Sequence, residues 1–449
     1  MSTNIPTRTK SSGGFGDLFK KEDYWAVWLG LGLVVFALLL WTSGSTFLKS
    51  IAVNFPGNWT DFNKITAFVT ANLTNLILLW LVFTVLFTVA VKTLGHKVGE
   101  FIGGFTILFI ASIIIYILGA SKFSNHYNLE SPIWALVLGM IVANLFTLPK
   151  WFNTSLRTEF YVKTGIVLLG ATLPFTMIIQ AGPAAFMQAT IIAVTTFLTI
   201  YFIGTKVLKL DRRFSATLAA GGSICGVSAS IAIGSSVKAE KQHVSVAISL
   251  VVVWAIVMVI ILPFVIKAFG IPDGPGGAWI GTSEFADAAG MAAAASISEQ
   301  AIRTFTLMKV VGRDMWIGIW CFIMALISVT QWEKDESGAK PKAGEIWYRF
   351  PKFVIGFFIA SILLTIIVAT SNAATASSVS ANVMGPVKVL RSWTFIFTFL
   401  SIGLTTRFRD LTSVGWKPFA AFTAGVCINV PLGFIFSTII LGGFWQLVK

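Results

Sequence analysis

A segment dense in glycine and serine is the part of the chain best suited to binding chemistry. It consists of Gly221, Gly222, Ser223, Ile224, Cys225 and Gly226, followed by Ser228. Glycine at this density disfavours a continuous helix, and unwound backbone within a membrane is tolerated only where it is buried or lines a cavity. Its free N–H groups, its hydroxyl groups and the positive end of the helix that follows would suit an oxyanion. The alternative is close packing of helices through small residues.

A second segment combines hydroxyl side chains with acids, namely Thr282, Ser283, Glu284 and Asp287. The two acids are three residues apart and share one face of a helix. Acids within a membrane are costly and usually functional, which favours binding of a proton or Na⁺ during transport. The alternative is that they stabilise the positive N-terminal end of a helix. Thr405, at the end of a later apolar stretch, is a further candidate hydroxyl donor.

Several cations lie within or beside apolar stretches. Lys238 follows the glycine-rich segment and is a candidate charge partner for a bound anion. Lys309 and Arg313, at i and i+4, either face a cavity or lie at the membrane interface. For Lys388 and Arg391, near the start of an apolar stretch, we expect snorkelling to the surface.

The sequence lacks the common catalytic and metal-binding patterns. Its three cysteines lie far apart in apolar stretches, without a CxxC or Cys/His ligand spacing. No HExxH is present, and the glycine-rich segment fails the GxSxG pattern because Cys225 stands where the last glycine belongs. We therefore expect a protein that is not an enzyme and binds no metal or other cofactor.

The composition indicates a membrane protein. Only 12% of the 449 residues are charged and 56% are hydrophobic, whereas soluble domains carry roughly 25% charged residues. Uncharged stretches occupy residues 24–48, 65–91, 101–121, 131–149, 164–205, 214–237, 244–266, 315–332, 353–387 and 418–448. A helix crosses the bilayer core with about 20 mostly apolar residues. The sequence therefore predicts an all-α, polytopic helical membrane protein.

Turn residues divide these stretches into about 11 to 13 spans. We expect helices at 25–42, 71–91, 101–119, 132–148, 162–181, 184–205, 215–236, 244–269, 284–302, 314–331, 353–371, 386–406 and 418–443. Gly182-Pro183 is the expected hairpin within the uncharged run 164–205. Segments 215–236 and 284–302 either cross the membrane or re-enter it.

The net charge of +14 is better explained by orientation than by nucleic acid binding, because no basic block with interleaved aromatic residues is present. Basic residues cluster at 8–21, 92–97, 150–163, 206–213, 334–352 and 407–417. All these clusters fall on one side of the membrane if the N-terminus is cytoplasmic. We therefore expect a multi-pass membrane protein with a cytoplasmic tail at 1–24.

An internal similarity suggests a repeated unit. Segments 170–186 and 403–419 share glycine, threonine and phenylalanine residues in register. The two segments are expected to cross in opposite directions, as in an inverted-topology repeat. Chance is the alternative, because glycine and phenylalanine are abundant. On this basis the chain divides into N-terminal spans at 25–131 and two repeats at 132–270 and 271–449.

The sequence resembles the sulfate exporter family of YeiH-type bacterial inner-membrane transporters, whose pattern is G-x-S-I-C-G-x-S/A-A followed by V-K-A. The agreement lies in residues 221–229, 237–239, 163–170, 279–282 and 404–406. The resemblance covers roughly residues 132–441. It implies two inverted repeats with crossing discontinuous helices, and transport of sulfate, a sulfonate or another small anion.

Two departures from that family are visible. Its second motif usually carries a polar pair such as His-Glu, where this chain has Phe285 and Ala286, so a histidine proton relay is not expected. The helices at 71–91 and 101–119 are an insertion relative to shorter relatives and form a peripheral pair that would help a homodimer to assemble.

The sequence thus predicts a secondary transporter that exports a small inorganic or organic oxyanion, coupled to H⁺ or Na⁺. A passive anion channel or uniporter is the alternative. The expected partners are the anionic substrate, the coupling ion, the lipid bilayer and a second copy of the chain.

Overall fold

The computed structural model describes residues 21–57, 59–126, 131–314, 316–332, 351–407 and 415–448. Most of the tail at 1–24 and the basic residues at 8–20, 334–349 and 409 lie outside these ranges, as does Phe408 of the internal similarity. Within the described residues, eight helices are long and apolar enough to span a membrane: Glu22–Thr42, Leu73–Thr93, Val98–Gly119, Phe175–Val207, Gln242–Ala268, Lys352–Thr370, Ala373–Thr405 and Trp416–Ile440. The chain is a polytopic helical membrane protein, as predicted.

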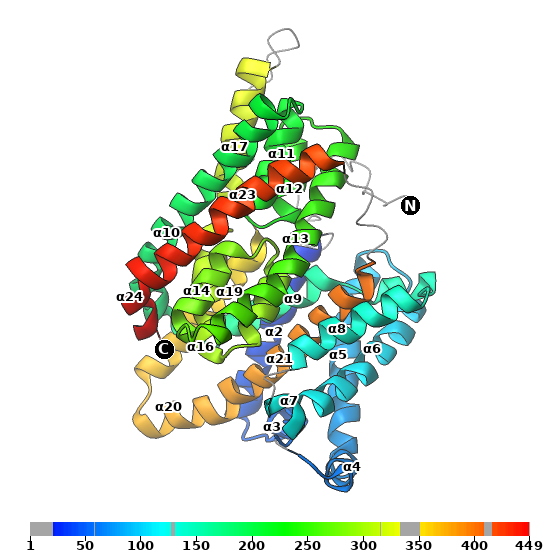
Figure 1. The fold of residues 1–449 in the computed structure, drawn as a ribbon. Helices are drawn as coiled ribbons and strands as arrows, with labels where there is room; N and C mark the ends of the chain where they lie inside the picture. Colours follow the sequence, from blue (N-terminus) through cyan, green and yellow to red (C-terminus); the bar gives the residue numbers. More distant parts are fainter. Residues whose placement is uncertain are drawn as a thin grey trace.

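One group of helices, here called the first bundle, packs around α9 and α21, and α3 to α8 lie in the lower right of Figure 1. Its long members are α2 (Glu22–Thr42), α5 (Leu73–Thr93), α6 (Val98–Gly119), α8 (Ser131–Leu145), α9 (Thr158–Gly170), α19 (Lys352–Thr370) and α21 (Gly385–Thr405). Shorter pieces at its edges are α3 (Phe47–Ile51), α4 (Phe62–Ala71), α7 (Lys122–His126), η1 (Lys150–Thr154), α20 (Ala373–Val379) and η5 (Ser380–Met384).

The remaining helices form the second bundle, in the upper left of Figure 1. They are α10 (Phe175–Phe202), η2 (Ile203–Val207), α11 (Arg212–Ser223), α12 (Val227–Ser236), α13 (Lys241–Ala268), α14 (Asp273–Ser283), α15 (Asp287–Ala295), α16 (Glu299–Thr306), η3 (Leu307–Arg313), α17 (Trp316–Ile327), η4 (Ser328–Trp332), α23 (Trp416–Phe434), η6 (Ile435–Ile440) and α24 (Gly442–Leu447). The short α15 touches α8, α9 and α21 of the first bundle and so joins the two.

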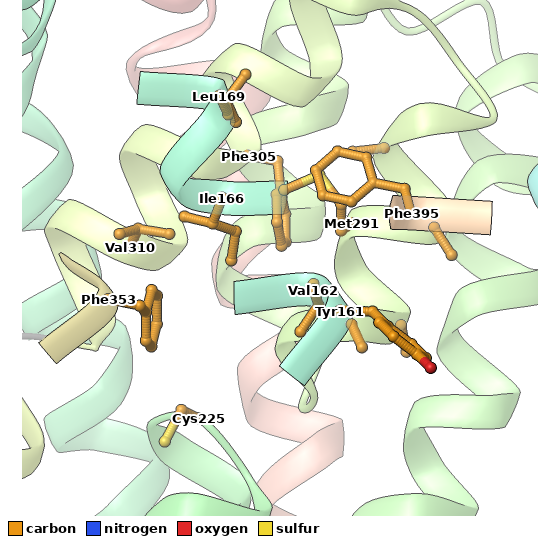
Figure 2. Packing of buried hydrophobic residues seen from close by; sticks show 14 of the residues in the cluster. Tyr161, Val162, Ile166, Leu169, Cys225, Met291, Phe305, Val310, Phe353 and Phe395 are labelled. Carbon is orange, nitrogen blue, oxygen red and sulfur yellow. The ribbon is translucent and has the colours of Figure 1, made fainter. Parts of the chain in front are cut away.

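The helix α9 lies at the centre of the molecule and is buried from Phe160 to Gly170. Figure 2 shows its side chains among Met291 and Phe305 of the second bundle and Phe353 and Phe395 of the first. Lipid is as apolar as these side chains, so close packing rather than exclusion of water holds such a core together.

Glycines allow the helices of the first bundle to approach backbone to backbone. A Cβ on Gly170 of α9 would lie 2.2 Å from the carbonyl oxygen of Phe357 in α19. A Cβ on Gly403 of α21 would lie 2.5 Å from the carbonyl oxygen of Leu136 in α8. These are the two leading glycines of the internal similarity, and both serve the same kind of contact. The division into repeats itself stays a prediction.

The expected hairpin at Gly182-Pro183 is wrong. Pro183 lies inside α10, which runs without a break from Phe175 to Phe202. The chain instead turns between α9 and α10, at residues 171–174. Pro174 explains this position, since it lacks an N–H and disfavours helical geometry at Leu173. The hydrogen bond lost at Pro183 is more easily tolerated in a packed membrane helix.

Candidate functional site

The first interruption of a helix lies in the glycine-rich segment, as predicted. α11 ends at Ser223, and α12 begins at Val227. Between them Gly226 has a φ of +71°, which residues with a side chain rarely adopt. A Cβ on Gly226 would stand 2.3 Å from the carbonyl oxygen of Phe285. Glycine is therefore required both by the backbone conformation and by the contact with a second interruption.

That second interruption separates α14 from α15. α14 ends at Ser283, Glu284 is extended, and α15 begins at Asp287. The Oε1 atom of Glu284 accepts hydrogen bonds from the N–H groups of Phe285 (3.0 Å) and Ala286 (3.2 Å). This carboxylate therefore satisfies donors just before α15, but its buried Oε2 has no hydrogen-bond partner among the described residues. The two interruptions meet inside the second bundle, and we call this region the crossing.

Arg313, the last residue of η3, joins the two interruptions. Its Nε donates to the carbonyl oxygen of Ser223 at 3.2 Å. Its Nη1 lies within hydrogen-bond distance of the carbonyl oxygens of Gly281 (3.1 Å), Thr282 (2.8 Å) and Glu284 (3.0 Å). A helix leaves carbonyl groups without partners at its C-terminal end, where positive charge is favoured. One buried guanidinium group thus caps the ends of both α11 and α14.

Lys309 acts one turn earlier in η3. Its Nζ donates to the carbonyl oxygen of Ile224 at 2.9 Å and lies 3.2 Å from Oδ1 of Asp287. The lysine side chain is fully buried and the aspartate side chain is 7% exposed. A buried ion pair of this kind depends on both partners, because removing one leaves the other charge uncompensated. Both Lys309 and Arg313 are buried, so the interfacial position is wrong, whereas their facing a cavity stays a prediction.

Asp314 is a member of this cluster that sequence reasoning missed. It is fully buried, and neither carboxylate oxygen has a hydrogen-bond partner among the described residues. It interacts electrostatically with Lys309, Arg313 and Asp287. The only sequence signal was its place directly after Arg313, at the start of a predicted span. The crossing therefore holds three buried carboxyl groups and two buried cations.

The structure brings most of the predicted substrate residues to the crossing, namely Gly221, Gly222, Ser223, Ile224, Cys225, Gly226, Ser228, Thr282 and Ser283. Close packing, the alternative to binding, accounts for the glycines at positions Gly221 and Gly222. A Cβ on Gly221 would lie 2.5 Å from Oγ of Ser230, and one on Gly222 would lie 2.5 Å from Cδ1 of Ile200.

The hydroxyl groups at the crossing differ in how well they are satisfied. The Oγ1 of Thr282 donates to the carbonyl oxygen of Trp279 at 2.9 Å. By contrast, the buried Oγ of Ser223 has no hydrogen-bond partner among the described residues. Ser228, in the first turn of α12, is half-buried. Ser223 is therefore a hydroxyl that could gain a partner from a ligand, and the buried Oγ of Ser230 in α12 is unpaired among the described residues in the same way.

Two predicted residues lie away from this buried region. Lys238 is exposed in the turn after α12, and the ten residues of α12 separate it from the interruption by about 15 Å. Thr405 is exposed at the end of α21, where its Oγ1 donates to the carbonyl oxygen of Ser401 in its own helix at 2.8 Å. The positive charge at the crossing comes from Lys309 and Arg313 instead.

Comparison with known proteins agrees that the chain is a membrane protein. Residues 103–422 match the family model described as conserved hypothetical protein 698. The chain belongs to this family. Its curated relatives are named UPF0324 membrane proteins, and those names state no substrate. No solved structure matches.

The UPF0324 relatives match over most of the chain. The protein of Rhodopirellula baltica is 33% identical over 84% of this chain and 69% of its own length. The protein of Nitrosomonas europaea is 30% identical over 89% of this chain and 91% of its own. A protein of Nitratidesulfovibrio vulgaris is 33% identical over 80% of this chain, which spans 62% of that relative. The resemblance found in the sequence is thus confirmed as membership of a membrane protein family.

Proposed function

We propose that this UPF0324 protein is an ion-coupled secondary transporter of the bacterial inner membrane that exports a small oxyanion, such as sulfate or a sulfonate. The observation that carries the proposal is the crossing, where two interrupted helices meet around buried charges in a polytopic membrane protein. Interrupted helices and buried charges at membrane depth are typical of substrate and ion sites in transporters.

The geometry supports an oxyanion at the start of α12. The positive end of that helix, the hydroxyl of Ser223 and the half-buried Ser228 surround the same turn. Arg313 adds positive charge, and its buried Nη2 has no hydrogen-bond partner among the described residues. A helix N-terminus combined with donors of this kind favours a small anion.

Charge balance supports coupling to a cation. If all five groups are ionised, Glu284, Asp287 and Asp314 outnumber Lys309 and Arg313 by one negative charge. Binding of a single H⁺ or Na⁺ would neutralise the cluster, which favours it in a medium of low dielectric constant. The carbonyl oxygens freed by the interruptions, which would suit Na⁺, already accept from Lys309 and Arg313. This arrangement favours H⁺ as the coupling ion.

The experiment that tests this function is anion flux into proteoliposomes, with sulfate, methanesulfonate and acetate as substrates and an imposed pH or Na⁺ gradient. We expect Ser223→Ala to lower uptake of the transported anion about tenfold, because one hydrogen bond to a charged group is lost. Ser249→Ala is the matched control, since within the described residues that hydroxyl donates to the carbonyl oxygen of Ser245 in its own helix (3.0 Å).

Three outcomes decide between the possibilities. Equal flux for the Ser223 and Ser249 variants would contradict an anion site at the start of α12. No flux of any anion would refute the transporter. Flux that ignores every cation gradient would indicate a uniporter or channel instead. Gly222→Leu is not a useful variant, because it would clash with Ile200 and disturb packing.

A further inference from the structure

A second polar region lies between the two bundles, away from the crossing. Here a cavity of about 450 Å³ is lined by the end of α6, the start of α8, the junction of α15 and α16, and α21. Asn54 and Ser131 line it, together with Arg391 and Glu299. Neither charged residue takes part in the function proposed above. Glu299 follows the C-terminal end of α15, whereas Asp287 at the crossing begins that helix.

Arg391 is buried in the interior and does not snorkel. Its helix continues back through η5 and α20 to residue 373, so the arginine lies near the middle of 33 continuous helical residues. Its side chain is 1% exposed and forms a two-pronged pair with Glu299, with Nη1–Oε1 at 3.2 Å and Nη2–Oε2 at 3.0 Å. Nη1 also lies 3.3 Å from Oγ1 of Thr172.

Glu299 occupies only one edge of this guanidinium group. A guanidinium group presents five N–H donors and can pair with an oxyanion through either its end or its side. The Nε of Arg391 is buried and has no hydrogen-bond partner among the described residues. The side edge therefore has an unused donor in a residue that lines the cavity.

The charges around the cavity are mostly positive. Lys388 also pairs with Glu299, at 3.3 Å, and Arg303 acts on the same carboxylate. A neighbouring cavity, also of about 450 Å³, is lined by Lys49 and Lys388 and shares Asn54 and Ser392 with the first. Arg391, Lys388 and Arg303 thus act on a single carboxylate, and Lys49 adds a fourth positive charge at the neighbouring cavity. A cleft lined by one sign of charge concentrates ligands of the opposite sign.

We propose that these two adjoining cavities form a vestibule that binds a small oxyanion at Arg391. Lys49 and Lys388 attract the anion, and the guanidinium group of Arg391 holds it in competition with the carboxylate of Glu299. The ligand class is a soluble sulfonate, sulfate or carboxylate. The planar or tetrahedral arrangement of its oxygens matches the paired N–H donors of an arginine.

Calorimetric titration of the purified protein in nanodiscs of neutral phosphatidylcholine tests this proposal, with methanesulfonate, sulfate and acetate titrated separately. Glu299→Gln removes the competing carboxylate, and we expect it to bind the best of these anions about tenfold more tightly than the unaltered protein. Arg391→Gln should bind it at least about tenfold more weakly. The double variant Glu299→Gln/Arg391→Gln leaves neither member of this pair as an unpaired charge. It should also bind weakly, and its weak binding then reports loss of the site and not misfolding.

Lys64→Gln is the control, because Lys64 is an exposed cation outside both cavities. The proposal is overturned if no anion binds, or if the Glu299 and Arg391 variants bind like the control. It is also overturned if the unaltered protein retains phosphatidylglycerol in place of the soluble anions and Arg391→Gln does not, since the occupant is then a lipid headgroup. Binding is measured without transport, so a vestibule can be found even if the flux experiment refutes the transporter, and the reverse.

Discussion

At the scale of single residues, the two interruptions depend on side chains that come from elsewhere in the chain. Gly226 allows the first interruption to form and to touch the second at Phe285. The carbonyl groups exposed by that geometry are then satisfied by Lys309 and Arg313. A membrane holds little water that could donate hydrogen bonds to these carbonyl groups, so leaving them unpaired would be costly. The two cations are therefore part of the structure of the crossing as well as candidates for its chemistry.

The balance of charge at the crossing leads to a prediction for Asp287. Replacing Asp287 by Asn leaves Glu284 and Asp314 against two cations, so the cluster is neutral without an added ion. We expect the variant to transport without dependence on the pH or Na⁺ gradient. The measurement is flux in proteoliposomes with each gradient imposed separately.

The matched control for this prediction is Asp273→Asn, an exposed carboxylate at the start of α14. It should keep the gradient dependence of the unaltered protein. If Asp287→Asn keeps that dependence too, Asp287 does not take part in coupling and Asp314 becomes the residue to test. Loss of all flux in Asp287→Asn would instead show that the ion pair with Lys309 is needed to build the crossing.

At the scale of helices, the continuity of α10 through Pro183 gives a test of the structure. Because Pro183 interrupts the hydrogen bonds of a continuous helix, Pro183→Ala should be tolerated and should raise the midpoint of thermal unfolding in detergent by roughly 1–3 °C. Pro174→Ala, in the real turn, is the comparison and should bring no such gain. A fall in stability for Pro183→Ala would point to a turn at that position.

The sequence allowed the helices to be located better than their connections. Long uncharged runs predicted the spans, and clustered glycines predicted the interruption at Gly226, because both signals are local. The turn was placed at Pro183 rather than Pro174, since a proline in a membrane helix can be absorbed by its neighbours. Nor could spacing show that Arg391 pairs with Glu299, because that contact joins residues 92 positions apart. Partners of buried charges are set by the packing of helices and not by local pattern.

At the scale of the whole molecule, the two bundles meet along a boundary that contains charge. The short α15 connects the crossing, at Asp287, to the vestibule, at Glu299, and it packs against helices of both bundles. The pair between Glu299 and Arg391 links the second bundle to the first. An anion that displaces Glu299 would therefore weaken a bond between the bundles at the moment when it occupies the vestibule. This arrangement would suit a protein in which the two bundles move relative to each other.

The orientation of the molecule decides which side of the membrane the vestibule faces. With a cytoplasmic N-terminus, Lys49 and Lys64 follow the first span and lie outside, whereas Lys97 follows the second long apolar helix and lies inside. All three are exposed. In a cysteine-free background, we expect Lys49→Cys and Lys64→Cys to react in intact cells with a maleimide that cannot cross the membrane. Lys97→Cys should react only after the cells are opened. The opposite pattern would reverse the orientation and place the vestibule on the cytoplasmic side, whereas the expected pattern places it on the outer side.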